Sequence, residues 1–199
     1  MKILHTADWH VGKRLDRFIR IDEQREVLAE IGSIADEHGV DLVVVAGDLY
    51  DTYNPGSEAE ELLYRALKTL AADGKRPVVA IAGNHDSPNR VIAPDVLARD
   101  HGIALIGYPE TTVRPFDGDG FRVEPLAPGL VQIVFDRFSS PVRILAVPYA
   151  NEYRMRRAFT GAVEELHPEP GLFGDVVEES YAEPELFDNA EELHAEPEL

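Results

Sequence analysis

The sequence predicts an α/β fold in which a sandwich of sheets is flanked by helices. Short apolar segments alternate with amphipathic helical patterns over residues 1–107, as expected of a parallel sheet that is covered on both faces. After Pro109 the apolar segments become short and are separated by Gly, Pro and Asp, which indicates antiparallel strands joined by hairpins. With 199 residues, the chain is long enough to form one sizeable core.

The first half alternates strands and helices in a regular order. The expected parallel strands are the apolar segments at residues 2–7, 42–46, 78–82 and 103–106. Residues 21–39 carry apolar side chains at the spacing of an amphipathic helix. A second helix is expected from Ser57, which has Glu60 three positions later as in a capping box, to Asp73-Gly74. A third helix is expected over residues 94–101.

The second half is predicted to contain a meander of strands, a last helix and then an acidic, proline-spaced segment. Antiparallel strands are expected at residues 111–116, 121–123, 131–135 and 142–147, and a last helix at 152–166. Beyond it the sequence is acidic and proline-spaced, and Ala182–Leu186 recurs unchanged as Ala195–Leu199. We therefore predict a folded domain over residues 1–157 and a flexible or peripheral segment over 158–199.

Composition restricts the compartment and the chemistry. The net charge of −18 is concentrated after Arg157, where 13 acidic residues occur without a single Lys or Arg. No stretch approaches the roughly 20 apolar residues of a membrane span, and no leader pattern is present, so a cytoplasmic protein without a membrane anchor is expected. Because cysteine is absent, a metal would be held by His, Asp, Glu or Asn, which suits Mn, Mg, Zn or Fe.

Polar side chains follow three of the predicted parallel strands. Asp8 and His10 come after the first strand, Asp48 after the second, and Asn84 after the third. Because ligands gather outside the carboxyl ends of parallel strands, these residues are expected to meet. We predict a site for two divalent ions, in which Asp8 and His10 hold one ion, Asn84 holds the other and Asp48 bridges both. Such a pair activates water and neutralises charge on a phosphoryl group.

Two neighbours of Asn84 are predicted to assist the reaction. His85 is assigned as the catalytic acid, because an imidazole next to a metal ligand can protonate a leaving oxygen. Asp86 is assigned to orient that imidazole from behind. A single Asp after a strand is more often a turn or cap residue. The three clusters together, in this order, favour a metal site.

The three motifs, Asp8-Trp9-His10, Gly47-Asp48 and Gly83-Asn84-His85-Asp86, resemble the first three signature motifs of the calcineurin-like metallophosphoesterases. Over roughly residues 1–107 the resemblance extends to the SbcD-type DNA nucleases of that family. It implies Mn²⁺ as the metal, with Mg²⁺ as the alternative. It also implies 3′→5′ exonuclease activity on double-stranded DNA and endonuclease activity on hairpins and single strands, in repair and recombination. The implied partners are DNA, an SbcC-type ATPase and a second copy of the chain, in a heterotetramer.

The chain also departs from this pattern. The family has three further metal-binding histidines, two of them in a Gly-His-x-His motif that this sequence lacks. The candidates outside the matched motifs, His101, His167 and His194, do not follow apolar strands. The fold is therefore expected to be incomplete on its C-terminal side. Two alternatives stay open: a phosphodiesterase for small substrates, and a catalytically incomplete fragment that dimerises or binds DNA ends.

Two further sets of residues have both a functional and a structural interpretation. His5, inside the first strand, either supports the metal site from the second shell or is a satisfied core histidine. The cations after the first motif either steer phosphate or belong to a solvated loop and helix start. Lys13, Arg14 and Arg17 are the DNA-binding candidates among them.

Overall fold

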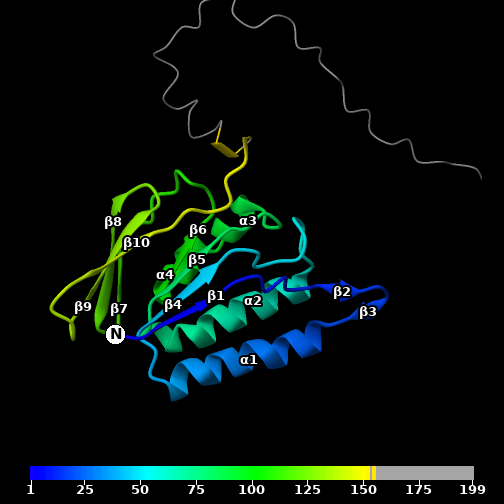
Figure 1. The fold of residues 1–199 in the computed structure, drawn as a ribbon, viewed down its shortest axis with the longest axis horizontal. Coiled ribbons are helices and arrows are strands. Elements are labelled where there is room, and N and C mark those ends of the chain that lie inside the picture. Colours follow the sequence, from blue (N-terminus) through cyan, green and yellow to red (C-terminus); the bar gives the residue numbers. More distant parts are fainter. Residues whose placement is uncertain (153, 156–199) are drawn as a thin grey trace, which may run out of the picture. The chain divides into compact units, whose positions relative to one another are not determined.

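The computed structural model describes residues 1–152, 154 and 155, which belong to the first of two units of the chain, Met1–Glu164. These residues form a parallel sheet that has the long helices on one face and an antiparallel sheet on the other (Figure 1). The predicted α/β sandwich is thereby confirmed. The segment 158–199, most of the predicted helix at 152–166, and His167 and His194 lie outside the described residues. The domain boundary at residue 157 stays a prediction.

The parallel sheet has the strand order β1-β4-β5-β6. Its strands are β1 (Ile3–Thr6), β4 (Leu42–Ala46), β5 (Val78–Ile81) and β6 (Ile103–Ile106). The connections contain α1 (Ile21–Glu37), α2 (Ser57–Leu70), the short 3-10 helix η1 (Ala72–Gly74), α3 (Pro88–Ile92) and α4 (Asp95–Asp100). All neighbouring strands are parallel, so their carboxyl ends lie at one edge.

The antiparallel sheet covers the face of the parallel sheet that the helices leave free. Its order is β10-β9-β8-β7, with β7 (Phe116–Gly118), β8 (Phe121–Ala127), β9 (Leu130–Phe135) and β10 (Val142–Leu145). The prediction of a strand at residues 111–116 was wrong, because the strand in this region begins only at Phe116. Thr111 instead closes a turn, in which its Oγ1 accepts a hydrogen bond from Tyr108 N at 2.9 Å.

Strand alternation divides the interior into two cores. On β4, Val43 and Val45 join the helical residues, whereas Leu42 and Val44 face the second sheet. The same alternation holds on β5 and β6, because successive side chains of a strand point to opposite faces. Burial on both faces explains why these strands are apolar throughout.

The structure adds a two-stranded hairpin that the sequence pattern did not predict. It consists of β2 (Arg14–Leu15) and β3 (Phe18–Ile19), between β1 and α1 (Figure 1). The helix α3 was also not predicted. Among the described residues, no helix combines the length and apolar character that crossing a membrane requires.

The predicted capping box of α2 was wrong. Gly56 is the N-cap of this helix and Ser57 is its first helical residue. Glu60 does not reach back to the N-cap, because its carboxylate binds Arg90 at 3.1 Å. The start of α2 is therefore held to α3 through this ion pair.

Candidate metal centre

The loops that follow β1 and β4 run side by side beyond the edge of the sheet. Asp8 N donates to Gly47 O at 3.1 Å, and His10 N donates to Asp48 O at 2.9 Å. The parallel pairing of the two strands therefore continues into the loops. This continuation brings the first two motifs together, as the strand order predicted.

The backbone is left-handed at three of the predicted ligands. Asp8, His10 and Asp48 have φ angles of 57°, 45° and 48°. Residues other than glycine adopt this region at a cost of about 1–3 kcal/mol each, and such residues concentrate at functional sites. The strained backbone conformation thus occurs at the residues whose side chains come together in the candidate site.

The side chains of these residues form a cluster that suits a divalent cation. His10 Nε2 lies 3.9 Å from Asp8 Oδ1 and 3.7 Å from Asp48 Oδ2. The three ligand atoms lie within 4.8 Å of one another. These separations are too long for hydrogen bonds, but they fit donors that share one ion at about 2.0–2.2 Å. The Asp8 side chain is 72% exposed and the Asp48 side chain 12%, so the cluster opens to solvent at Asp8.

His85 joins the cluster from the loop after β5. Its backbone N donates to Asp48 Oδ1 at 3.0 Å, and its ring packs edge-on against His10 with centroids 4.8 Å apart. Its Nδ1 donates to the carbonyl of Asp51 at 2.8 Å. Because a carbonyl can only accept, Nδ1 carries the proton. Nε2 is then the nitrogen available to exchange a proton with a substrate, and the residue is exposed.

Asp51 is a further residue of the candidate site, and it lies outside the three motifs. In addition to accepting from His85, it places its Oδ1 3.4 Å from the buried Nδ1 of His10. His10, Asp51 and His85 form a second group able to hold a metal. A carboxylate three residues after Asp48 was the available sequence signal.

Asp86 is buried and binds the backbone of two loops. Its carboxylate accepts from Leu49 N at 3.0 Å, Tyr50 N at 2.8 Å and Gly83 N at 2.7 Å. These three bonds replace the predicted contact with the imidazole of His85, because a buried carboxylate needs donors for both oxygens. Asp86 therefore holds the second and third motifs together.

Gly83 is required by a close approach. A Cβ at this position would lie 2.1 Å from both the backbone N and Oδ1 of Asp48. The next residue, Asn84, is exposed and lies in the same loop as His85. The third motif thus contacts the second with no room for a side chain between them.

A glutamine near the start of α1 holds the first motif. Gln24 Nε2 donates to His10 O at 2.8 Å, and Gln24 Oε1 accepts from Gly12 N at 2.9 Å. Sequence reasoning did not single it out, because one polar residue in a helix carries no distinctive signal. A hollow of about 440 Å³ lies beside this loop, and its lining includes Asp8, Lys13 and Gln24.

Not every predicted residue reaches the centre. His5 is exposed on the edge strand β1 and belongs to neither metal-binding group. Lys13 does lie close, with Nζ 3.7 Å from Asp51 Oδ1. Arg14 and Arg17 are exposed on the β2–β3 hairpin, and His101 follows α4 outside both groups.

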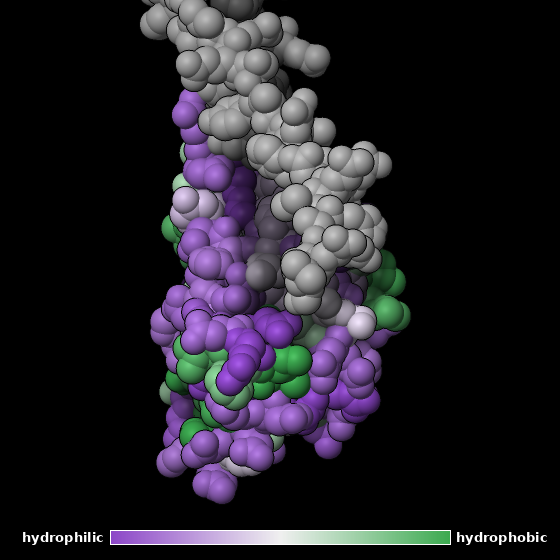
Figure 2. Space-filling view, turned by 90° about the vertical axis from the view of Figure 1, so that its right-hand side faces the viewer, coloured by the Kyte–Doolittle hydropathy of each residue, from purple (hydrophilic) through white to green (hydrophobic). Residues whose placement is uncertain are grey.

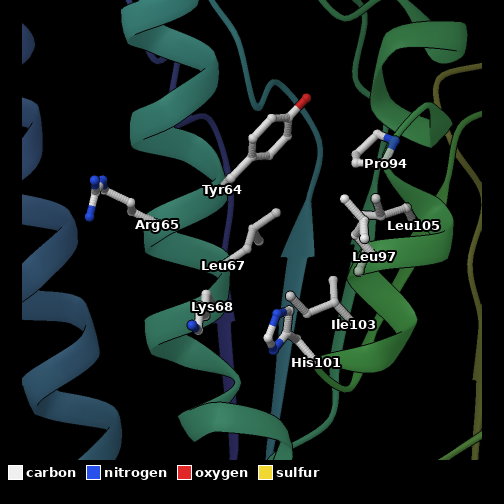
Figure 3. Close-up of a pocket in the computed structure, with 10 residues that line it drawn as sticks. Tyr64, Arg65, Leu67, Lys68, Pro94, Leu97, His101, Ile103 and Leu105 are labelled. Carbon is white, nitrogen blue, oxygen red and sulfur yellow. The ribbon is translucent and has the colours of Figure 1, made fainter.

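A separate apolar groove of about 270 Å³ lies between α2 and α4. Tyr64 and Leu67 of α2 face Pro94 and Leu97 across it (Figure 3). The groove contains neither of the metal-binding groups. Its apolar lining distinguishes it from a site for a charged phosphoester.

The family model of the calcineurin-like phosphoesterases matches residues 1–187. The chain therefore belongs to this family of metal-dependent phosphoesterases, which confirms the resemblance of the three motifs. The family uses divalent metals, and the two groups around His10 offer ligands for them.

Three curated relatives are similar in sequence to part of the chain. The D subunit of the nuclease SbcCD from Bacillus subtilis is 51% identical over 111 residues, which are 56% of this chain and 28% of the relative. The proteins of the same name from Rhodobacter capsulatus and Staphylococcus epidermidis are 43% identical over 108 residues and 42% identical over 91. These matches cover 54% and 46% of this chain, and 27% and 24% of the relatives. The matched region thus spans about a quarter of each relative's length.

Proposed function

We propose that the chain is the metal-binding part of a Mn²⁺-dependent DNA nuclease of the SbcD type. Its activities would be 3′→5′ exonuclease cleavage of double strands and endonuclease cleavage of hairpins and single strands, in repair and recombination in the cytoplasm. The observation that carries the proposal is the convergence of Asp8, His10 and Asp48 beside His85. The nuclease names of the relatives support DNA as the substrate.

The residues divide the chemistry between metal binding and proton transfer. Two divalent ions, held by Asp8, His10, Asp48 and Asn84, would supply an activated water and neutralise charge on the phosphodiester. Asp48 suits the shared position, because its Oδ2 faces His10 and its Oδ1 binds the loop of Asn84. Oxygen donors with one imidazole favour Mn²⁺ or Mg²⁺ over softer ions. With Nδ1 donating to Asp51 O, His85 would carry a second proton on Nε2 and would give that proton to the leaving oxygen, which returns the ring to its neutral form.

The β2–β3 hairpin offers a surface for the phosphate backbone. Lys13, Arg14, Arg17 and Arg20 are exposed there, close in sequence to the metal ligands. Leu15, Phe18 and Ile19 are also exposed, and Figure 2 shows hydrophobic atoms among hydrophilic ones on this side of the molecule. Cations near the cleavage centre would attract DNA despite the net charge of −18.

We further propose that the protein works as a homodimer with an SbcC-type ATPase. We assign the apolar groove between α2 and α4 to the contact with the second copy. Leu97 on α4, which lines the groove, is 69% exposed. A two-fold dimer would bury this face on both copies.

Cleavage of DNA and of bis-p-nitrophenyl phosphate by the full chain, each with Mn²⁺, tests the activity. We expect hairpin DNA to be cut with the higher kcat/KM, and Asp48→Asn to lower the rate at least about 100-fold because it removes the shared ligand. Asp117→Asn, at an exposed residue of β7, is the matched control. Preference for the small ester would favour the phosphodiesterase alternative, and an active Asp48→Asn would contradict the metal site.

The remaining candidate is a catalytically incomplete binding module. Such a module would keep the fold and would dimerise or bind DNA ends without cleaving them. Metal stoichiometry separates the two: two ions per chain with turnover support the nuclease, whereas one ion or none without turnover supports the binding module.

A further inference from the structure

Arg154 is a buried cation that binds the loop of the third motif. The residue is only 5% exposed and follows β10 in the chain. Its Nη1 donates to Gly83 O at 3.0 Å and to Tyr149 O at 3.1 Å, and its Nη2 donates to Asp86 O at 2.7 Å. The guanidinium therefore spans the two carbonyls that bracket Asn84 and His85.

The surrounding segment holds Arg154 in this place. Tyr149 N donates to Ala82 O at 2.9 Å, which attaches the segment after β10 to the end of β5. Asn151 Oδ1 accepts from Arg154 N at 2.8 Å, and the guanidinium lies 5.2 Å from the centre of the Tyr149 ring. A buried charge is costly unless it is hydrogen-bonded, so this arrangement needs all of its carbonyl partners.

The loop of residues 83–86 is thus bound by one side chain that accepts hydrogen bonds and by another that donates them. The Asp86 carboxylate accepts backbone N–H groups, including that of Gly83, whereas Arg154 donates to the carbonyls of Gly83 and Asp86. A planar guanidinium presents its donors in a fixed fork, which an ammonium cannot reproduce. Its two nitrogens therefore fix the separation of the two carbonyls.

We propose that Arg154 is a positioning residue that sets the geometry of the loop carrying Asn84 and His85, and thereby the affinity of the centre for its divalent ions. The proposal rests on the proposed function, because it assumes that the centre binds a metal. Through Arg154 the segment 149–155 becomes part of the support of the metal centre, although it contributes no ligand.

Arg154→Gln and Arg154→Lys test this role in the full chain, with Mn²⁺ binding followed by isothermal titration. Loss of support behind a metal ligand lowers affinity about 10- to 100-fold, so we expect this loss in Arg154→Gln and a smaller one in Arg154→Lys. Arg143→Gln, an exposed arginine on β10 that binds Gln132 at 3.3 Å, should leave the affinity unchanged. Wild-type affinity in a folded Arg154→Gln would overturn the proposal.

Backbone amide exchange gives a readout that does not depend on activity. In the metal-free full chain, Arg154→Lys should speed exchange at residues 83–87, whereas Arg143→Lys should not. A second experiment uses the wild type and so does not depend on a variant that folds. Mn²⁺ should slow amide exchange at residues 83–87 and also at residues 149–155. If the segment around Arg154 raises the affinity for the metal, metal binding must in turn stabilise that segment. Protection confined to 83–87 would overturn the proposal. Absence of Mn²⁺ binding by the wild type would instead contradict the proposed function.

Discussion

Asp51 contacts both histidines of the candidate metal centre, through different atoms. Its carbonyl accepts from Nδ1 of His85, and its carboxylate lies beside Nδ1 of His10. Both Nδ1 atoms face Asp51, while Nε2 of His10 faces Asp8 and Asp48. Burial raises the pKa of the Tyr50 phenol, with the charge of Tyr64 adding to the effect, so Tyr50 stays protonated and is no proton donor. His85 therefore stays the proposed acid of the site.

Replacing His85 by Gln should separate catalysis from metal binding. We expect kcat for hairpin DNA to fall about 10²- to 10⁴-fold, because general acid catalysis is lost. The Mn²⁺ affinity should change little, because the proposed ligands are Asp8, His10, Asp48 and Asn84, and Nδ1 of His85 is occupied by its hydrogen bond to Asp51 O. Single-turnover cleavage and titration with Mn²⁺ measure the two quantities. His38→Gln, after α1, is the matched control, and an unchanged kcat in His85→Gln would exclude the assigned role.

The elements of the parallel sheet could be predicted because their strands are buried on both faces. Val43 and Val45 are buried in the core beside the helices, and Val79 is buried in the core beside the second sheet; all three are apolar and β-branched. The convergence of the three motifs could also be predicted, because the carboxyl ends of parallel strands lie at the same edge of a sheet. The hairpin could not be predicted, since its side chains are exposed and show no alternation of apolar and polar residues. Likewise, the contact of Asp51 with His85 uses a main-chain carbonyl, which no residue pattern reveals.

The hairpin is expected to bind DNA through charge. Arg14→Gln and Arg17→Gln should weaken binding to all sequences alike and reduce the salt slope, d log K/d log[salt], by about 0.9 for each phosphate that is no longer neutralised. Fluorescence anisotropy of a labelled duplex over a range of NaCl concentrations measures the slope. Arg122→Gln, at an exposed arginine of β8, is the matched control. If its slope changes as much as those of the hairpin variants, the hairpin is not the DNA surface.

At the scale of the whole molecule, the described part of the chain combines the candidate metal centre, which is open to solvent, with a separate apolar groove. The centre lies at the carboxyl ends of the parallel strands, and the groove lies between α2 and α4. The two features use different residues, so assembly and metal binding can be perturbed separately.

Leu97→Asp should disrupt the proposed dimer without disturbing the candidate metal centre. The side chain is 69% exposed in the single chain, so a charge there costs little before association and much once it is buried in an interface. Light scattering should show a monomer, while Mn²⁺ affinity stays at the wild-type value. Val134→Asp, at an exposed position of β9, is the control. A wild-type chain that is already monomeric, or a Leu97→Asp variant that still dimerises, would refute this assignment.

The central claim is that Asp8, His10, Asp48 and Asn84 hold two divalent ions. Anomalous scattering at the Mn absorption edge, recorded from crystals of the full chain soaked in Mn²⁺, tests it most directly. We predict two peaks at the carboxyl ends of β1, β4 and β5, with Asp48 contacting both. Mn²⁺ peaks elsewhere only, or none within bonding distance of Asp48, would contradict the account.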